Sequence, residues 1–103
     1  MDVNNVLEQM IYPVVDETRH TITRRAEEMR KSPETPLFGK GAVLDSLGLV
    51  NFLLAVEERV ESEAGAVLTL ASETAMSRSA SPFRTLGTLA EYVRDLLDEP
   101  NRT

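Results

Sequence analysis

One expected helix constrains the fold of this chain more than any other feature, because it has two apolar sides. On a helical wheel at about 100° per residue, residues 46–61 place one apolar row in a single arc, as in a helix that packs on a core. A second apolar row follows at i, i+3 and i+7, roughly 140° away around the helix. The first row is Leu49, Phe52, Leu53, Val56 and Val60, and the second is Leu47, Val50 and Leu54. One row is enough to attach the helix to a small domain, so the second predicts a docking surface.

Acidic side chains border the second row, which Glu57, Glu58 and Glu61 flank. The net charge of −6 is also unevenly distributed. Residues 1–40 carry six basic and seven acidic side chains, whereas residues 41–103 carry five basic and ten acidic ones. The acidic half should repel nucleic acid and attract basic patches on partner proteins, with an attraction that salt weakens.

Length and composition indicate one small folded domain. The chain has 103 residues, of which 42% are hydrophobic, so it can bury a core. It has no cysteine and one histidine, which excludes disulfides, thiol chemistry and a zinc site of paired ligands. No apolar run approaches the ~20 residues of a membrane span, and the N-terminus does not resemble a signal peptide. We therefore expect a cytoplasmic monomer without stable membrane insertion.

Helical periodicity and capping residues predict an all-α fold of three main helices and one short helix. Pro13 lies inside the first helix, where it either kinks the helix or begins a second one, and the sequence leaves both open. Asp2 or Asn4 is the expected N-cap of the first helix, Ser72 of the short helix and Thr85 of the last. The expected elements are a helix over 3–30, a loop over 31–45, a helix over 46–62, a loop over 63–72, a short helix over 73–77, a helix over 86–97 and a frayed tail over 98–103.

The loops carry apolar and glycine residues that predict their packing. Leu37 and Phe38 should enter the core, and Gly39 and Gly41 indicate a turn with positive φ. The loop after the second long helix should be held against the core by its apolar residues Val67, Leu68 and Leu70.

Ser46 stands where this second long helix begins, next to the outward apolar row. The ordinary role of such a residue is capping, in which Asp45 or Ser46 accepts hydrogen bonds from amides of the first turn. The free amides and the dipole of a helix N-terminus also stabilise an attached anion, by roughly 0.3–1 kcal/mol. Ser46 is therefore a chemically suitable place to attach a phosphodiester.

The run from Leu44 to Glu58 resembles the motif of acyl carrier proteins. Thr85 and Leu86, followed by Leu89, Tyr92 and Val93, are similar to the start of that family's last helix, so the resemblance covers residues 36–97. It implies a four-helix bundle of the acyl-carrier type. It also implies a 4′-phosphopantetheine arm, donated by coenzyme A and attached to Ser46, with Asp45 and Leu47 completing the motif.

The resemblance further implies how partners are recognised. The second apolar row, Leu47, Val50 and Leu54, would contact partner enzymes, and the acidic border, Glu57, Glu58 and Glu61, would meet their Arg and Lys side chains. These partners would be a phosphopantetheinyl transferase and the acyl-loading and acyl-processing enzymes of lipid, fatty-acid or polyketide biosynthesis. The protein itself would be a carrier and no enzyme.

Three residues depart from the pattern of fatty-acid carriers. Gly48 and Asn51 stand where those carriers usually have acidic side chains, and Arg59 adds a positive charge to the helix. The segment between residues 62 and 85 is also longer. These departures indicate a specialised, free-standing carrier that serves a dedicated set of enzymes.

Three other interpretations are open. An aminoacyl carrier of the D-alanine type would use the same arm with different partners. An interaction module would pair through its long first helix, whose apolar spacing resembles part of a heptad pattern, and Ser46 would be only a helix cap. A hydrolase would need a base beside Ser46, but His20 is expected on the solvated surface of a different helix.

Overall fold

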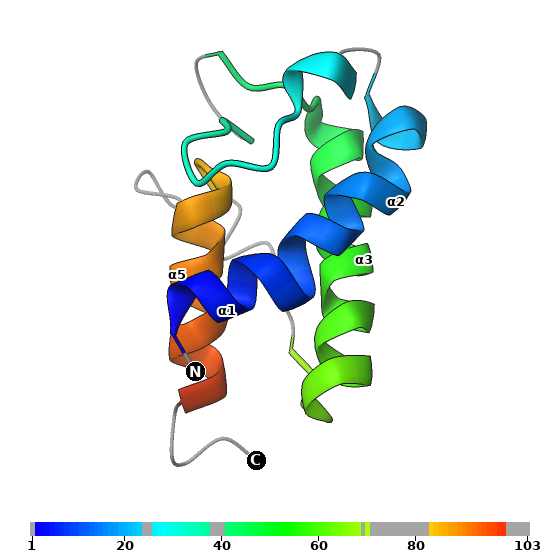
Figure 1. The fold of residues 1–103 in the computed structure, drawn as a ribbon. Coiled ribbons are helices and arrows are strands. Elements are labelled where there is room, and N and C mark those ends of the chain that lie inside the picture. Colours follow the sequence, from blue (N-terminus) through cyan, green and yellow to red (C-terminus); the bar gives the residue numbers. More distant parts are fainter. Residues whose placement is uncertain (1, 24–25, 38–40, 69, 71–82, 99–103) are drawn as a thin grey trace.

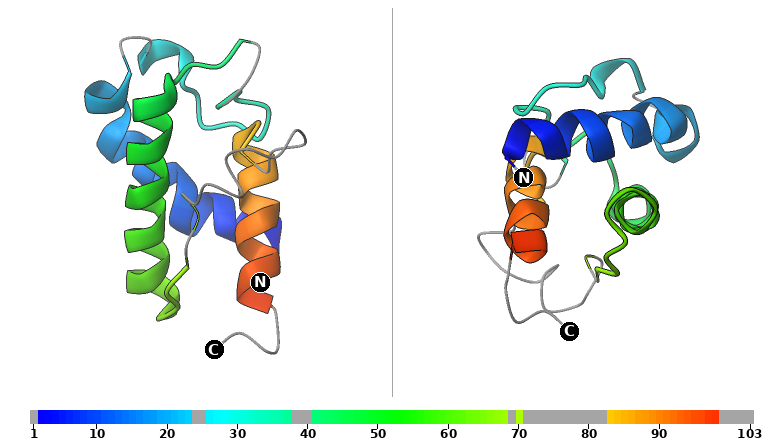
Figure 2. Two further views of the ribbon diagram at one scale, coloured as in Figure 1. Left: turned by 180° about the vertical axis from the view of Figure 1, so that it is seen from behind. Right: turned by 60° about the horizontal axis from the view of Figure 1, so that its bottom comes forward.

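The N-terminal helical run crosses the other two long helices and contacts both (Figure 1). The computed structural model describes residues 2–23, 26–37, 41–68, 70 and 83–98. The run consists of α1 (Val3–Val6), the π-helical turn η1 (Leu7–Ile11) and α2 (Tyr12–Ile22). Helix α1 packs against α5 (Leu86–Asp98), α2 packs against α3 (Ser46–Ala64), and η1 contacts both. Figure 2 shows the run lying across α3 and α5 in two further views.

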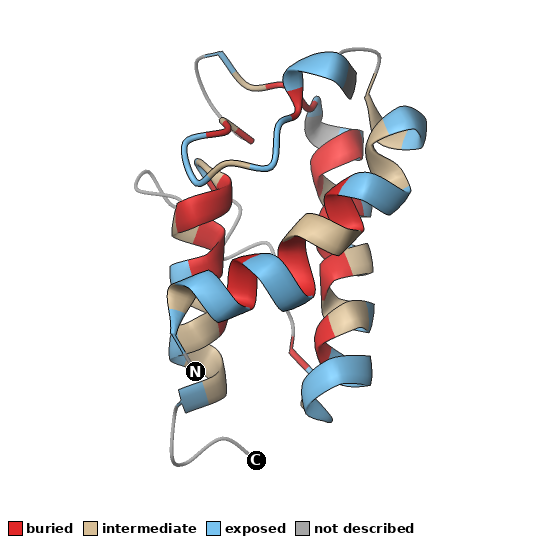
Figure 3. Ribbon diagram, viewed as in Figure 1, coloured by how far each residue is buried: buried red, intermediate tan, exposed pale blue. Residues whose placement is uncertain are grey.

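The core lies where these helices face one another, and buried residues follow the inner side of each helix (Figure 3). The predicted inner row of α3 is confirmed, since all five of its members are buried. The inner face of α5 is buried at Leu86, Leu89, Ala90 and Val93 and half-buried at Leu96 and Leu97. The described residues are mostly helical and contain no strand, only one isolated bridge.

Pro13 follows a π-helical turn and lies in the first turn of α2, which is close to the option in which a second helix begins at Pro13. The amide of Tyr12 bonds to the carbonyl of Leu7, five residues back, and Pro13 then stands in the first turn of α2. In an uninterrupted α-helix, the amide of residue 13 would bond to the Gln9 carbonyl, but proline has no N–H. Arg59 Nε of α3 donates to this carbonyl at 3.3 Å instead. Arg59 also pairs with Glu17 at 3.8 Å, so it links α3 to the N-terminal run.

The prediction of a first helix reaching residue 30 is wrong, because α2 ends at Ile22. Thr23 is extended, with φ −151° and ψ 145°, and its hydroxyl donates to the Val43 carbonyl at 2.6 Å. This bond offers Thr23 an alternative to the helix, at the end of a stretch where β-branched residues already weaken helicity. Between residues 26 and 30, the structure then has a short 3-10 turn, η2 (Ala26–Glu28).

The segment after η2 is fastened to the start of α5. The amide of Leu37 donates to the Arg84 carbonyl at 2.7 Å, and the amide of Leu86 donates to the Thr35 carbonyl at 3.1 Å. Leu37 is fully buried, as predicted. Thr85 is confirmed as the cap of α5, because its hydroxyl accepts a hydrogen bond from the amide of Thr88 at 3.1 Å.

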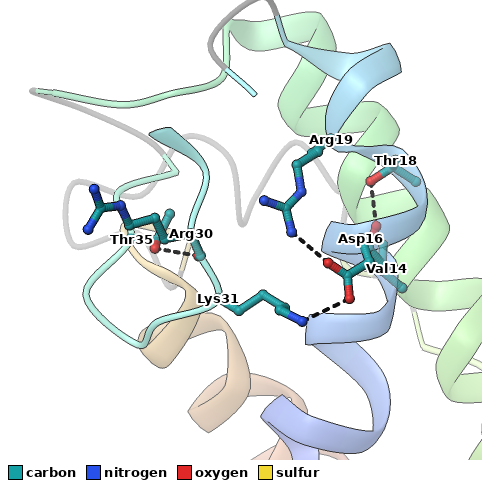
Figure 4. A network of polar contacts seen from close by, with 7 residues as sticks. All are labelled: Val14, Asp16, Thr18, Arg19, Arg30, Lys31 and Thr35. Carbon is teal, nitrogen blue, oxygen red and sulfur yellow. Dashed lines mark hydrogen bonds and ion pairs between the residues drawn. The ribbon is translucent and has the colours of Figure 1, made fainter. Parts of the chain in front are cut away.

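A small polar network joins the same segment to α2 (Figure 4). Asp16 accepts hydrogen bonds from Lys31 Nζ at 3.0 Å and from Arg19 Nη2 at 2.6 Å. The bond from Lys31, followed by that from Arg19, holds the pKa of Asp16 below its ordinary value of 3.8. Within the segment, the hydroxyl of Thr35 donates to the Arg30 carbonyl at 2.6 Å.

The C-terminal end of α3 lies two residues beyond the predicted position. Gly65 adopts the left-handed conformation, with φ 68°, and its amide bonds to the Glu61 carbonyl. Of the apolar residues expected to hold the following loop, Leu68 and Leu70 are buried, but the prediction for Val67 is wrong because it is 71% exposed.

The structure tests several further predictions, and others concern residues that it does not describe. Asp2, one of the two proposed N-caps, accepts from the amide of Asn5 at 2.8 Å. Gly41 has the expected positive φ, of 79°. Phe38, Gly39 and the short helix over 73–77 with its cap Ser72 lie outside the described residues. No helix in the described part of the chain is long and apolar enough to cross a membrane.

Replacing Arg59 tests the link between α3 and the π-helical turn. Arg59→Ala leaves the Gln9 carbonyl without its side-chain donor, so we expect the free energy of unfolding to fall by about 1 kcal/mol in urea denaturation. Arg94→Ala is the matched control, because among the described residues Arg94 pairs only with its neighbour Asp95 on the same helix surface. Equal losses in the two variants would contradict the assigned role.

The lowered pKa of Asp16 predicts a defined pH dependence. A carboxylate with a depressed folded-state pKa stabilises the fold above its unfolded-state pKa and loses that contribution as the pH falls through the folded-state value. Asp16→Asn should therefore be less stable than the wild type at pH 7, and the difference should disappear on acidification below 3.8. The urea unfolding midpoints of the variant and the wild type, taken from pH 7 to below 3.8, measure this difference in stability, with Glu8→Gln as the control variant. A difference independent of pH would contradict the prediction.

Candidate functional site

The candidate site is built on the first turn of α3. Asp45 is extended and precedes the helix, and its Oδ1 accepts from the amide of Gly48 at 2.7 Å. The capping role, which the sequence left open between Asp45 and Ser46, is therefore filled by Asp45. Ser46 is the first residue of α3, and its side chain lies outside what the structure describes.

Gly48 brings the end of α2 against the start of α3. A Cβ at this position would lie 2.5 Å from the Ile22 carbonyl oxygen and 3.1 Å from Asp45 Oδ1. Because the first of these neighbours is backbone, no side-chain rotation could relieve the contact. In the sequence, Gly48 stands out only because fatty-acid carriers usually have an acidic side chain at this position. The structure gives it a packing role beside the Ser46 position.

A groove of about 670 Å³ opens next to this contact. It lies between the last turn of α2, the segment 42–44 and the first turns of α3. Asp45 and Leu47, the two chain neighbours of Ser46, both line it. His20 and Asn51, both exposed, line it from α2 and α3. The sequence predicted the exposure of His20, but only the tertiary structure brings it to the same groove as the neighbours of Ser46.

The second apolar row of α3 faces outward, as predicted. Leu47 is 70% exposed, Leu54 is 47% exposed, and Val50 between them is half-buried. Two large apolar side chains are thus exposed on one face of α3.

The acidic border divides into two kinds of residue. Glu58 and Glu61 are exposed. Glu57 is half-buried, and its Oε2 accepts a hydrogen bond from the amide of Leu70 at 2.7 Å. Glu57 thus holds the segment after α3 against the helix, a role that the sequence did not reveal.

A second, smaller groove of about 230 Å³ lies along the C-terminal half of α3. Its rim is acidic and its wall apolar, with the residues Leu54, Glu57, Glu58, Glu61, Val67 and Leu68. Val67 belongs to this surface and not to the core. Two features of the sequence could have predicted that Val67 is exposed. Gly65 ends the helix, and in the segment after it an outward Val67 alternates with an inward Leu68.

The described residues contain no group of three His, Asp or Glu side chains placed to hold a metal ion. Comparisons of the chain with protein-family models, with curated proteins and with solved structures found no match. The function of the chain must therefore be inferred from the residues of the site.

The close contact at Gly48 predicts an unusual substitution effect. Alanine normally stabilises a helix relative to glycine by about 1 kcal/mol. Gly48→Ala should instead lower the free energy of unfolding by about 1–3 kcal/mol, because the added Cβ collides with the Ile22 carbonyl. Thermal and urea unfolding measure this, with Asn51→Ala on the exposed side of the same helix as control. A stabilised Gly48→Ala protein would disprove the contact.

Proposed function

We propose that this protein is a non-catalytic acyl carrier, in which Ser46 bears a 4′-phosphopantetheine arm transferred from coenzyme A. The observation that carries the proposal is the position of Ser46 as the first residue of α3, directly before the 70% exposed Leu47. The resemblance of residues 44–58 to the acyl-carrier motif supports the same assignment. When attached, the arm supplies a thiol that holds acyl groups as thioesters.

The first turn of α3 fits the phosphodiester of such an arm. Asp45 engages the amide of Gly48 with its side chain and the amide of Leu49 with its carbonyl. The amides of Ser46 and Leu47 come earlier in the turn, where a helix offers no backbone acceptor. They point toward the N-terminal end, where the helix dipole favours an anion. The groove beside Leu47 leaves space for the arm next to its attachment point.

The outward face of α3 fits docking by partner enzymes. Leu47 and Leu54 offer exposed apolar contacts, and Glu58 and Glu61 add negative charge beside them. A complementary partner presents an apolar patch bordered by Arg or Lys, and its association weakens with salt. Glu57 contributes charge to this face while one of its oxygens bonds to Leu70. The partners would be a phosphopantetheinyl transferase and the acyl-loading and acyl-processing enzymes.

The departures from fatty-acid carriers support a specialised carrier. Gly48 packs against α2, where an acidic side chain would collide with the Ile22 carbonyl. Asn51 is exposed and uncharged. The first half of the docking face therefore carries less negative charge than its second half. This distribution would select partners whose basic residues lie toward the C-terminal end of α3.

Arm transfer tests the proposed function directly. Incubation of the protein with coenzyme A and a broad-range phosphopantetheinyl transferase should add the mass of one arm, measured by intact-protein mass spectrometry. Ser46→Ala should abolish the addition. Ser62→Ala, which removes an exposed serine from the same helix, should leave it unchanged. An unmodified wild-type protein would overturn the proposal and favour a helical interaction module in which Ser46 lies beside the Asp45 cap.

A further inference from the structure

The groove beside the start of α3 lies where an arm on Ser46 would begin. Two of its lining residues, Asp45 and Leu47, are joined to Ser46 by peptide bonds. From there the groove extends to the last turn of α2, at His20 and Thr21. Its volume of about 670 Å³ is within the range of sites that hold small molecules. The residue that would bear the arm therefore stands between two residues that line this groove.

The groove is lined by both apolar and polar residues, and a pantetheine arm likewise has apolar and polar parts. Its apolar part includes Val43 and Leu44, which are almost fully buried, and the half-buried Ile22. Its polar part includes His20 and Asn51, whose side chains make no hydrogen bond or ion pair with the described residues. A pantetheine arm consists of a branched apolar portion and two amides. The apolar wall suits the first, and imidazole and carboxamide side chains can form hydrogen bonds with the second.

We infer that the arm on Ser46 rests in this groove between α2 and α3, with its amides bonded to His20 and Asn51. This inference rests on the proposed function, because it requires an arm on Ser46. Leu47 belongs both to the groove and to the outward row. A partner enzyme that covers Leu47 therefore competes with the resting arm, and docking favours release of the arm toward the enzyme.

Amide spectra of the full-length protein before and after arm transfer test the resting site. Besides the neighbours of Ser46, the amides of Thr21, Thr23 and Asn51 should shift when the arm is attached. The two threonines are far from Ser46 in sequence but line the groove. Shifts confined to residues 45–49, or shifts at the second groove near Leu54 and Val67 instead, would overturn the inference.

The reactivity of the arm's thiol provides a second readout. In the resting state the groove restricts the thiol, so the combined variant His20→Ala and Asn51→Ala should raise its alkylation rate by at least about twofold. Asn4→Ala is the matched control, because it removes an exposed amide from α1. An unchanged rate in the combined variant would overturn the inference.

The two proposals fail in different ways. If the transferase adds no arm to the wild-type protein, the proposed function fails and the resting site fails with it. If the arm is added but the amides of Thr21, Thr23 and Asn51 do not shift, only the resting site fails.

Discussion

The crossing of the N-terminal helical run over α3 and α5 is the constraint on which the rest of the structure depends. Helix α1 contacts α5, α2 contacts α3, and the π-helical turn between them contacts both. Buried residues of the run, such as Val6 and Ile11, are fully enclosed. The turn that Pro13 imposes would leave a backbone carbonyl without its usual partner, and Arg59 of α3 bonds to it. A local defect in one helix thus becomes a link between two.

The same crossing positions the candidate site. Because α2 ends at Ile22 and Thr23 bonds to Val43, the end of α2 lies beside the segment that leads into α3. Gly48 allows the two backbones to approach, and the groove lies next to this contact. The start of α3 is therefore held from two directions, by the Asp45 cap and by α2. A modification carried there would begin from a fixed point rather than from a loop.

The side chains of α3 that pack in the core and those that are exposed lie on different sides of the helix. Its inner row is buried in the core, while Leu47 and Leu54 remain exposed on the outer side. The acidic residues divide in the same way, since Glu57 bonds to the backbone of Leu70 while Glu58 and Glu61 stay exposed. Substitutions at Glu57 would therefore change stability as well as surface charge. Substitutions at Glu58 and Glu61 would change the charge with little effect on the fold.

The sequence determined the features that depend on near neighbours along the chain. Apolar periodicity located the inner row of α3, and side-chain oxygens located the caps at Asp2 and Thr85, because each involves residues only three or four positions apart. The tertiary structure alone decided how α2 ends before Thr23, how Arg59 compensates for Pro13 and how Glu57 holds Leu70. These bonds join residues 20, 50 and 13 positions apart, and no local pattern encodes which distant groups meet. The groove near Ser46 exists for the same reason, since its two sides come from different helices that only packing brings together.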